Sequence, residues 1–266
     1  LSLYNSKSGE RGIFNRDACT NKAKEAGRKV EGFFFGCNPC SEIILRPKQF
    51  CNLTEVIVRY DDTIESLKEK IKNATILGTW QSTLTYFPYL SKDWQDNCEE
   101  ERLLGVSLTG VMDNPILNNN HTNLPDVLNE LKQVALDTNK EWSAKLGINH
   151  SVSVTCNKPS GTVSQLQNCA SGLHPRHSPY YTRTVRADIK DPLSKFMIDK
   201  GFVHEVDSMN PSNYVFSFAI KSPDDAACRK DITAIEHLEL WLTYYKYWCQ
   251  HKPSVTISVQ DHEWLE

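Results

Sequence analysis

Apolar residues recur at helical spacing in several segments of the chain. Ile64, Leu67 and Ile71 fall on one face between charged residues, which predicts a helix over residues 62–74. The same periodicity predicts a longer helix over residues 126–146, which ends before a glycine as many helices do. Two further helices are expected over residues 191–200 and 232–249.

Short apolar or β-branched runs, bounded by turn residues, lie between these helical segments and predict strands. The strands are expected over residues 103–110, 151–156, 180–185, 214–220 and 254–259. Strands that alternate with long helices predict an α/β fold with parallel strands. Because no internal repeat or low-complexity tract is present, repeat architectures are excluded.

Length and charge limit the function classes. The 266 residues are enough for one large α/β domain or two small ones. With 30 basic against 33 acidic residues, no basic excess favours a nucleic-acid partner, although small nucleotide ligands are not excluded. The sequence has neither a secretory signal nor a run of about 18 apolar residues, which a membrane span would need. We therefore expect a cytoplasmic enzyme without a membrane partner.

Nine cysteines, an odd number at modest density, predict mostly reduced thiols. Two of them, Cys37 and Cys40, lie three positions apart, near Glu42 and between apolar runs. One interpretation is a buried loop, because most free cysteines act as small hydrophobic residues. A thioredoxin-type dithiol or half of a zinc site is a second interpretation. Against it, no helix-forming sequence follows Cys40, and no second ligand pair stands at credible zinc spacing.

A third interpretation takes Asn38, Cys40 and Glu42 together with Cys51. Asn-Pro-Cys-Ser-Glu-Ile, followed by Cys51 eleven positions after Cys40, resembles the central cysteine loop of class II ribonucleotide reductases, particularly the monomeric triphosphate reductases. The proline before Cys40 and the short gap carry this resemblance, since class I enzymes usually have leucine there and a longer gap. Cys37 departs from the family pattern and receives no role.

The resemblance implies a radical enzyme that reduces ribonucleoside triphosphates to 2′-deoxyribonucleotides, with adenosylcobalamin as its cofactor. Cys40 would carry the thiyl radical, Glu42 would be the general base on the substrate 3′-hydroxyl, and Asn38 would orient the sugar oxygens. Glu42 and Asn38 each lie two residues from Cys40, so an extended loop would place the three side chains on one face. Cys51 would be one of the two reducing thiols. A thioredoxin-like reductant would restore them by thiol exchange.

A second motif follows the strand predicted at 151–156, and it consists of Pro159, Ser160, Gly161, Thr162 and Val163. Taken alone it is a weak signal, because such a sequence is more often an ordinary turn. The family holds the nucleotide phosphates with a loop of this kind, and a glycine and two hydroxyls at a helix start suit that role. We therefore expect a phosphate loop at about residues 157–164. Lys158 beside it is interpreted as a solvated lysine.

The resemblance extends nearly end to end, through segments 9–15, 102–110, 171–175 and 254–258. It implies the second half of a ten-stranded α/β barrel, with a central active-site loop at about residues 33–58. Because the chain starts without Met and ends just after a predicted strand, we expect a fragment of a longer protein, inactive alone. The upstream half of the barrel, with the second reducing cysteine and the nucleotide effector sites, and the C-terminal tail would then lie outside it.

Two other classes stay open. One is a class I large subunit that reduces diphosphates with a radical-generating partner subunit. The other is a non-catalytic relative of the family, or a zinc- or thiol-bearing binding module.

Overall fold

The computed structural model describes residues 2–6, 12–118 and 123–263. Positions 9–11 of the segment 9–15 lie outside these described residues. In chain order the helices and strands are α1 (Ser2–Ser6), α2 (Arg16–Glu25), β1 (Gly36–Cys37), β2 (Ile44–Leu45), β3 (Asn52–Ile57), α3 (Ile64–Gln81), α4 (Lys92–Glu101), β4 (Leu104–Thr109), η1 (Val111–Asp113), α5 (Leu124–Leu146), α6 (Val163–Leu166), β5 (Tyr180–Asp188), α7 (Pro192–Asp199), β6 (His204–Val206), β7 (Asn213–Lys221), α8 (Ala234–Tyr247) and η2 (Asp261–Glu263).

The centre of the fold is the parallel strand pair β3–β4, in register from Asn52 opposite Leu104 to Ile57 opposite Thr109. All six residues of β4 are buried. The prediction of a buried strand at 103–110 and of parallel pairing is confirmed here. Buried strands of this kind need cover on both faces, and helices supply it.

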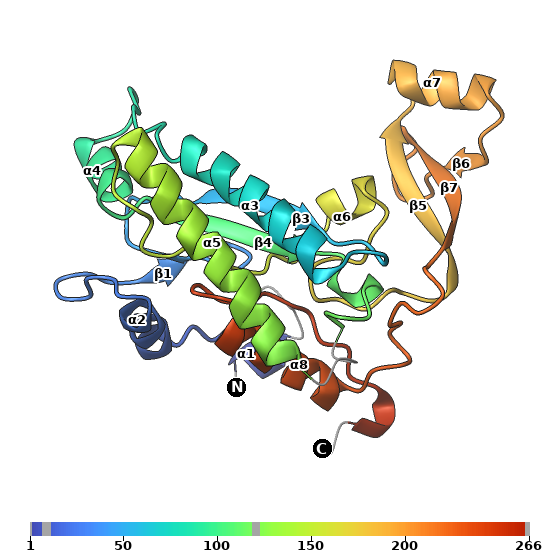
Figure 1. Ribbon diagram of the computed structural model, residues 1–266. Helices are drawn as coiled ribbons and strands as arrows, with labels where there is room; N and C mark the ends of the chain where they lie inside the picture. The colour runs from blue at the N-terminus through green and yellow to red at the C-terminus, as the bar shows by residue number, and fades with distance from the viewer. Residues whose placement is uncertain (1, 7–11, 119–122, 264–266) are drawn as a thin grey trace.

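Helices α3 and α5 lie side by side over the β3–β4 pair, and α8 packs against α5 (Figure 1). Thr63 caps α3 in a capping box with Ser66, and Gly147 ends α5 with a φ of +67°. Leu67 and Ile71 on the buried face of α3 belong to the main hydrophobic core. The helices predicted at 62–74, 126–146, 191–200 and 232–249 are confirmed, and the first of them extends to Gln81.

The strand predicted at 151–156 is present only as an extended segment beside β4. Its contact with β4 is a parallel bridge between Val106 and Thr155, and the Cys156 amide donates to the Val106 carbonyl at 3.1 Å. The Thr155 carbonyl instead accepts the amides of Gln250 and His251, at 3.1 and 3.0 Å. The amides of Leu104 and Val106 donate to the consecutive carbonyls of Ser153 and Val154, at 3.0 and 2.8 Å, so the register slips by one residue. A regular ladder therefore does not form, and the prediction of a full strand is wrong.

The strand predicted at 254–259 is also wrong. Pro253 makes a parallel bridge to Asn157, and the Ser254 amide donates to the Asn157 carbonyl at 2.9 Å. Beyond this point the Thr256 amide donates to the His174 ring at 2.9 Å and not to a neighbouring strand. Residues 254–259 form no strand, because a side chain takes the hydrogen bond that a ladder would need.

A separate sheet with the order β5-β7-β6 carries α7 and projects away from the centre (Figure 1). The strands predicted at 180–185 and 214–220 are confirmed here as β5 and β7. Their pairing is antiparallel, so the expectation of parallel strands does not hold for this arm. A short connection from β6 to β7 reverses the chain and permits only antiparallel pairing. Within the described residues, no helix is both long and apolar enough to span a bilayer.

Candidate functional site

The cysteine motif folds as a short hairpin, residues 36–45, which we call the cysteine hairpin. Strands β1 and β2 pair antiparallel, with Cys37 opposite Ile44. The tip is a tight turn, since the Ser41 amide donates to the Asn38 carbonyl at 2.9 Å and the Ser41 φ is +66°. The hairpin therefore carries Cys40 on a turn and not on an extended backbone.

This turn overturns the expectation that Asn38, Cys40 and Glu42 share one face through extended spacing. Cys40 is exposed at the tip, whereas the Glu42 side chain is completely buried. Asn38 and Glu42 do meet, because the Asn38 side-chain amide donates to Glu42 Oε1 at 2.8 Å. The other end of that amide accepts from the Ile43 amide at 3.0 Å, which fixes its orientation.

Only one of the two Glu42 carboxylate oxygens has hydrogen-bond partners among the described residues. Its Oε1 accepts from Asn38 and also from the Lys158 ammonium at 2.7 Å. Its Oε2 is buried and has no hydrogen-bond partner among the described residues. Buried carboxylate oxygens normally have a hydrogen-bond partner, and Oε2 lacks one. A bound ligand with a hydrogen-bond donor could supply it.

Lys158 connects this carboxylate to the predicted phosphate loop. The interpretation of Lys158 as a solvated lysine is wrong, because 23% of its side chain is exposed and its ammonium pairs with Glu42. Burial disfavours the charged ammonium, but the hydrogen bond and ion pair with Glu42 outweigh burial and raise the pKa of Lys158. The contact joins residues 116 positions apart, so no local pattern in the sequence could have indicated it.

Glu55 is a second carboxylate of this region that sequence reasoning did not single out. It lies on β3 directly opposite Ser107 of β4, and the Ser107 hydroxyl accepts the Lys158 backbone amide at 2.9 Å. Burial raises the pKa of Glu55, although Ser160 and the charge of Lys158 oppose the shift. Its Oε1 has no hydrogen-bond partner in the described part of the chain.

Cys51 precedes β3 and lies in the same electrostatic environment. Burial raises the pKa of its thiol strongly, the positive charges of Arg28 and Lys158 oppose the shift, and Glu42 adds to it. The structure therefore brings Cys51 close enough to Glu42 and Lys158 for their charges to act on it. Cys156 is fully buried nearby, and its thiol pKa is likewise raised by burial and by Cys51.

The residues of the predicted phosphate loop differ in how buried they are. Ser160 has a φ of +56° and is 6% exposed. Its hydroxyl lies close enough to Glu55 to lower the pKa of that carboxyl, but it makes no hydrogen bond of full geometry among the described residues. Gly161, Thr162 and Val163 are exposed, and open space surrounds the position where a side chain would extend from Gly161. The helix that follows is a single turn, α6, and Thr162 does not cap it. The expected contribution from a helix N-terminus is therefore small, and the buried Ser160 hydroxyl is the stronger feature.

Gly172 lies against the backbone at the start of the phosphate loop, so a larger residue at this position should destabilise the protein. Gly172 has a φ of +55°, and a Cβ there would lie 2.2 Å from the Lys158 carbonyl oxygen. Gly172→Ala should therefore destabilise the full-length protein by about 3 kcal/mol, measured by chemical denaturation. The matched control is Gly147→Ala, where φ is +67° but no atom lies within 4 Å, and the loss should be about 1 kcal/mol. Equal losses would contradict a steric role for Gly172.

Buried polar groups anchor the cysteine hairpin on its inner side. Arg28 donates to the Ile44 carbonyl at 2.7 Å and pairs with Glu101 at 2.7 Å. The His251 ring accepts from the Ile44 amide at 3.3 Å and donates to the Leu104 carbonyl at 3.0 Å, so it bridges β2 and β4. Burial, together with the charge of Arg28, lowers the pKa of His251 to about 3, which keeps this ring neutral.

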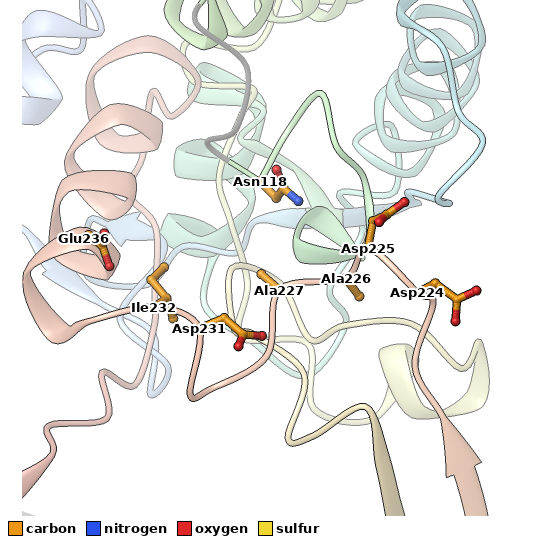
Figure 2. A pocket seen from close by; sticks show the side chains of 8 residues that line it. All are labelled: Asn118, Asp224, Asp225, Ala226, Ala227, Asp231, Ile232 and Glu236. Atoms are coloured by element: carbon orange, nitrogen blue, oxygen red, sulfur yellow. The ribbon is translucent and has the colours of Figure 1, made fainter.

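An acidic cavity of about 440 Å³ lies near the start of α8 (Figure 2). It contains none of the residues that the sequence singled out. Its carboxylates already have partners: Asp225 accepts from the Tyr60 hydroxyl at 2.7 Å, and Asp224 pairs with Lys221 at 2.8 Å. Within the described ranges, no three His, Cys, Asp or Glu side chains are grouped so that they could hold a metal ion.

No family model matches the chain. Curated relatives do match it. The adenosylcobalamin-dependent ribonucleoside-triphosphate reductase of Lactobacillus gasseri is 27% identical over 96% of this chain and 38% of its own length. The enzymes of the same name from Lactobacillus leichmannii and Euglena gracilis are 26% and 28% identical, over 97% and 84% of this chain. They are matched over 39% and 30% of their own lengths, so the chain spans well under half of each relative.

Solved structures support the same fold. A crystal structure of a B12-dependent class II ribonucleotide reductase superposes with a TM-score of 0.73 at 23% identity, over 86% of this chain and 35% of that one. The α subunit of a class Id ribonucleotide reductase from Actinobacillus ureae gives 0.57 at 15% identity, over 93% of this chain and 52% of that one. The resemblance indicated by the cysteine loop is therefore confirmed: over nearly its whole length, this chain is similar to adenosylcobalamin-dependent ribonucleoside-triphosphate reductases.

Proposed function

We propose that the protein containing this chain reduces ribonucleoside triphosphates to 2′-deoxyribonucleotides through a thiyl radical on Cys40. The observation that carries the proposal is the pairing of an exposed thiol with a buried carboxylate on one hairpin, where Glu42 keeps one oxygen without a partner. Relatives that cover nearly the whole chain are named for this reduction. Both the activity and the substrate are thus inferred for the longer protein.

The chemistry assigns a separate task to each side chain. The Cys40 sulfur radical takes the hydrogen atom from C3′, so that an S–H bond forms as the C3′–H bond breaks. Glu42 receives the proton of the 3′-hydroxyl, for which its free Oε2 is suited, and Asn38 holds the carboxylate in place. The 2′-hydroxyl leaves as water with a proton from a thiol, and Cys40 returns the hydrogen atom to C3′.

Two electrons and a hydrogen for C2′ are still needed, and two thiols supply them as they become a disulfide: one proton leaves with the water, the other hydrogen forms the new C2′–H bond, and Glu42 returns its proton to the 3′-oxygen. Cys51 is proposed as one of them, and its partner is a cysteine outside this chain. The raised pKa of Cys51 means that it stays a protonated thiol, and not a thiolate, at neutral pH. A thioredoxin-like reductant would restore both thiols by exchange.

All nine cysteines of the chain are free thiols, which supports a reducing, cytoplasmic setting.

Adenosylcobalamin is the proposed cofactor, as the names of the relatives suggest. A cofactor that generates a radical on a protein sulfur must be able to approach that sulfur. Cys40 is exposed at the tip of the cysteine hairpin, so it fits this requirement. When bound, the cofactor supplies the radical, and Cys40 is the residue of this chain that would face it.

The substrate phosphates are proposed to bind at Pro159–Val163. The buried Ser160 hydroxyl, which lies near Glu55 but makes no hydrogen bond of full geometry among the described residues, and the open space at Gly161 support this placement. Lys158 adds a positive charge immediately before the loop, at the position that links it to Glu42. A nucleotide would thus lie with its sugar at the cysteine hairpin and its phosphates at residues 157–164.

The ten-stranded barrel belongs to the same proposal, with residues 33–58 as its central loop. The parallel β3–β4 pair, with residues 153–157 on the other side of β4, supports it as part of such a barrel. Nucleotide effectors are proposed to bind outside this chain.

The cofactor requirement separates this function from the class I alternative. With the full-length protein, a dithiol and ribonucleoside triphosphates, we expect deoxyribonucleotide formation only when adenosylcobalamin is added. Chromatography of the products, with and without the cofactor, measures it. Reduction of diphosphates that needs a partner subunit and no cobalamin would overturn the class II assignment.

A further inference from the structure

Lys158 connects the two ends of the proposed nucleotide site. Its backbone is held by Ser107 at 2.9 Å and continues into the phosphate loop, while its ammonium reaches Glu42 at 2.7 Å. The same residue therefore belongs to the phosphate end through its main chain and to the sugar end through its side chain.

In this ion pair, fewer contacts fix the lysine side chain than fix the glutamate side chain. An ammonium has three N–H donors, and the one hydrogen bond that the described structure gives Lys158 Nζ is to Glu42. The Lys158 side chain is 23% exposed, whereas that of Glu42 is 0% exposed. Glu42 is fixed by Asn38 and by burial, but the ammonium can move towards solvent and towards the loop without losing another bond.

Two buried polar groups lie near this ion pair. The Ser160 hydroxyl lies close enough to Glu55 to lower the pKa of that carboxyl, although neither the hydroxyl nor Glu55 Oε1 makes a hydrogen bond of full geometry among the described residues. The charge of Lys158 acts on Glu55 as well as on Glu42. A phosphate at the loop would bring negative charge to a region that already contains two carboxylates, and Lys158 is a cation that acts on both of them.

We propose that Lys158 is a phosphate-responsive positioning residue: it neutralises Glu42 in the empty site and transfers to the substrate phosphates when they bind. This inference rests on the proposed function. In the empty site, the pair prevents a buried carboxylate from standing without a cation, which would be costly. With a nucleotide bound, the ribose 3′-hydroxyl donates to the free Oε2 of Glu42, and the ammonium leaves Oε1 for the phosphates. Occupation of the phosphate loop thereby removes the neutralising ammonium from the proposed base.

Steady-state kinetics of the full-length enzyme show whether the Lys158 ammonium transfers to the substrate phosphates or stays on Glu42. If the ammonium leaves Glu42 in the substrate complex, Lys158→Met removes a charge-assisted phosphate contact. KM for the ribonucleoside triphosphate should then rise roughly tenfold or more, while kcat stays within about threefold. Lys158→Arg keeps the charge, so KM should return to within about threefold of the wild-type value.

The opposite pattern contradicts the inference. If Lys158 stays on Glu42 throughout, Lys158→Met should lower kcat and leave KM nearly unchanged. The matched control is Lys145→Met, which removes a surface lysine paired with Glu141 and should change neither constant. If Lys158→Met does not fold, Lys158→Arg decides: a lowered kcat with unchanged KM overturns the proposal. A wild-type enzyme without ribonucleotide reduction would instead refute the proposed function itself.

Discussion

Cys40→Ser is expected to abolish ribonucleotide reduction in the full-length enzyme while nucleotide binding is retained. The loss should be at least about four orders of magnitude, because this side chain is proposed to make and break the bond to the reacting hydrogen. Binding should persist, since Cys40 is exposed and makes no hydrogen bond within the described residues. A serine hydroxyl matches the thiol closely in shape but does not form a comparable reversible radical. Product analysis measures the activity, and equilibrium dialysis with a ribonucleoside triphosphate measures the binding.

Cys37→Ser on the same hairpin is the matched control. Cys37 lies in β1, half-buried, with its sulfur 3.6 Å from the Ser41 hydroxyl. We expect its replacement to leave turnover within about threefold of wild type, because Cys37 has no proposed role in the reaction. Retained turnover in Cys40→Ser would refute the radical assignment. Equal losses in the two variants would favour the dithiol interpretation of Cys37 and Cys40.

The elements that were predicted correctly are those whose apolar residues follow one period. In α3, Leu67 and Ile71 are fully buried, as helical spacing requires. Helix α4 was not predicted, because its buried residues are only Cys98 and Glu101 and it has no apolar stripe. What α4 buries is largely a charge, and hydrophobic periodicity cannot indicate a helix of that kind.

The candidate site also contains some features that the sequence predicted and others that it could not predict. The motif placed Asn38 and Glu42 together, and the structure gives them a hydrogen bond of 2.8 Å. The sequence could not indicate that Ser41 would adopt a positive φ, which turns Cys40 away from the extended arrangement. Nor could it indicate Lys158, whose contact with Glu42 depends on how the hairpin packs against β4. Short-range patterns give the chemistry of the side chains, whereas the tertiary packing decides which of them meet.

Glu101→Ala is expected to destabilise the full-length protein by about 3–5 kcal/mol, the cost of leaving a buried ion pair without one partner. The Glu101 side chain is 2% exposed, and it pairs with Arg28 at 2.7 Å and Arg46 at 3.0 Å. Gln49 also donates to it, at 2.6 Å. Without the carboxylate, Arg28 would remain buried without this ion-pair partner, and Arg46 would keep only its pair with the half-exposed Glu100. Chemical denaturation gives the change in the free energy of unfolding.

The adjacent Glu100 provides the control, because it shares the partner Arg46 but not the burial. Glu100 pairs with Arg46 at 2.8 Å, and its side chain is 50% exposed. Glu100→Ala should therefore cost about 1 kcal/mol or less, since solvent screens an exposed pair. Similar losses in the two variants would show that burial of Glu101 does not determine the stability of this network.

The consequence for the site follows from Arg28, which links Glu101 to the cysteine hairpin. Arg28 donates to the Ile44 carbonyl at 2.7 Å, immediately after the segment that carries Cys40 and Glu42. If Glu101 fixes Arg28, then Glu101→Ala should also lower turnover under conditions where the variant is still folded, and Glu100→Ala should not. A destabilised Glu101 variant with wild-type turnover would mean that the network supports the fold but does not position the hairpin.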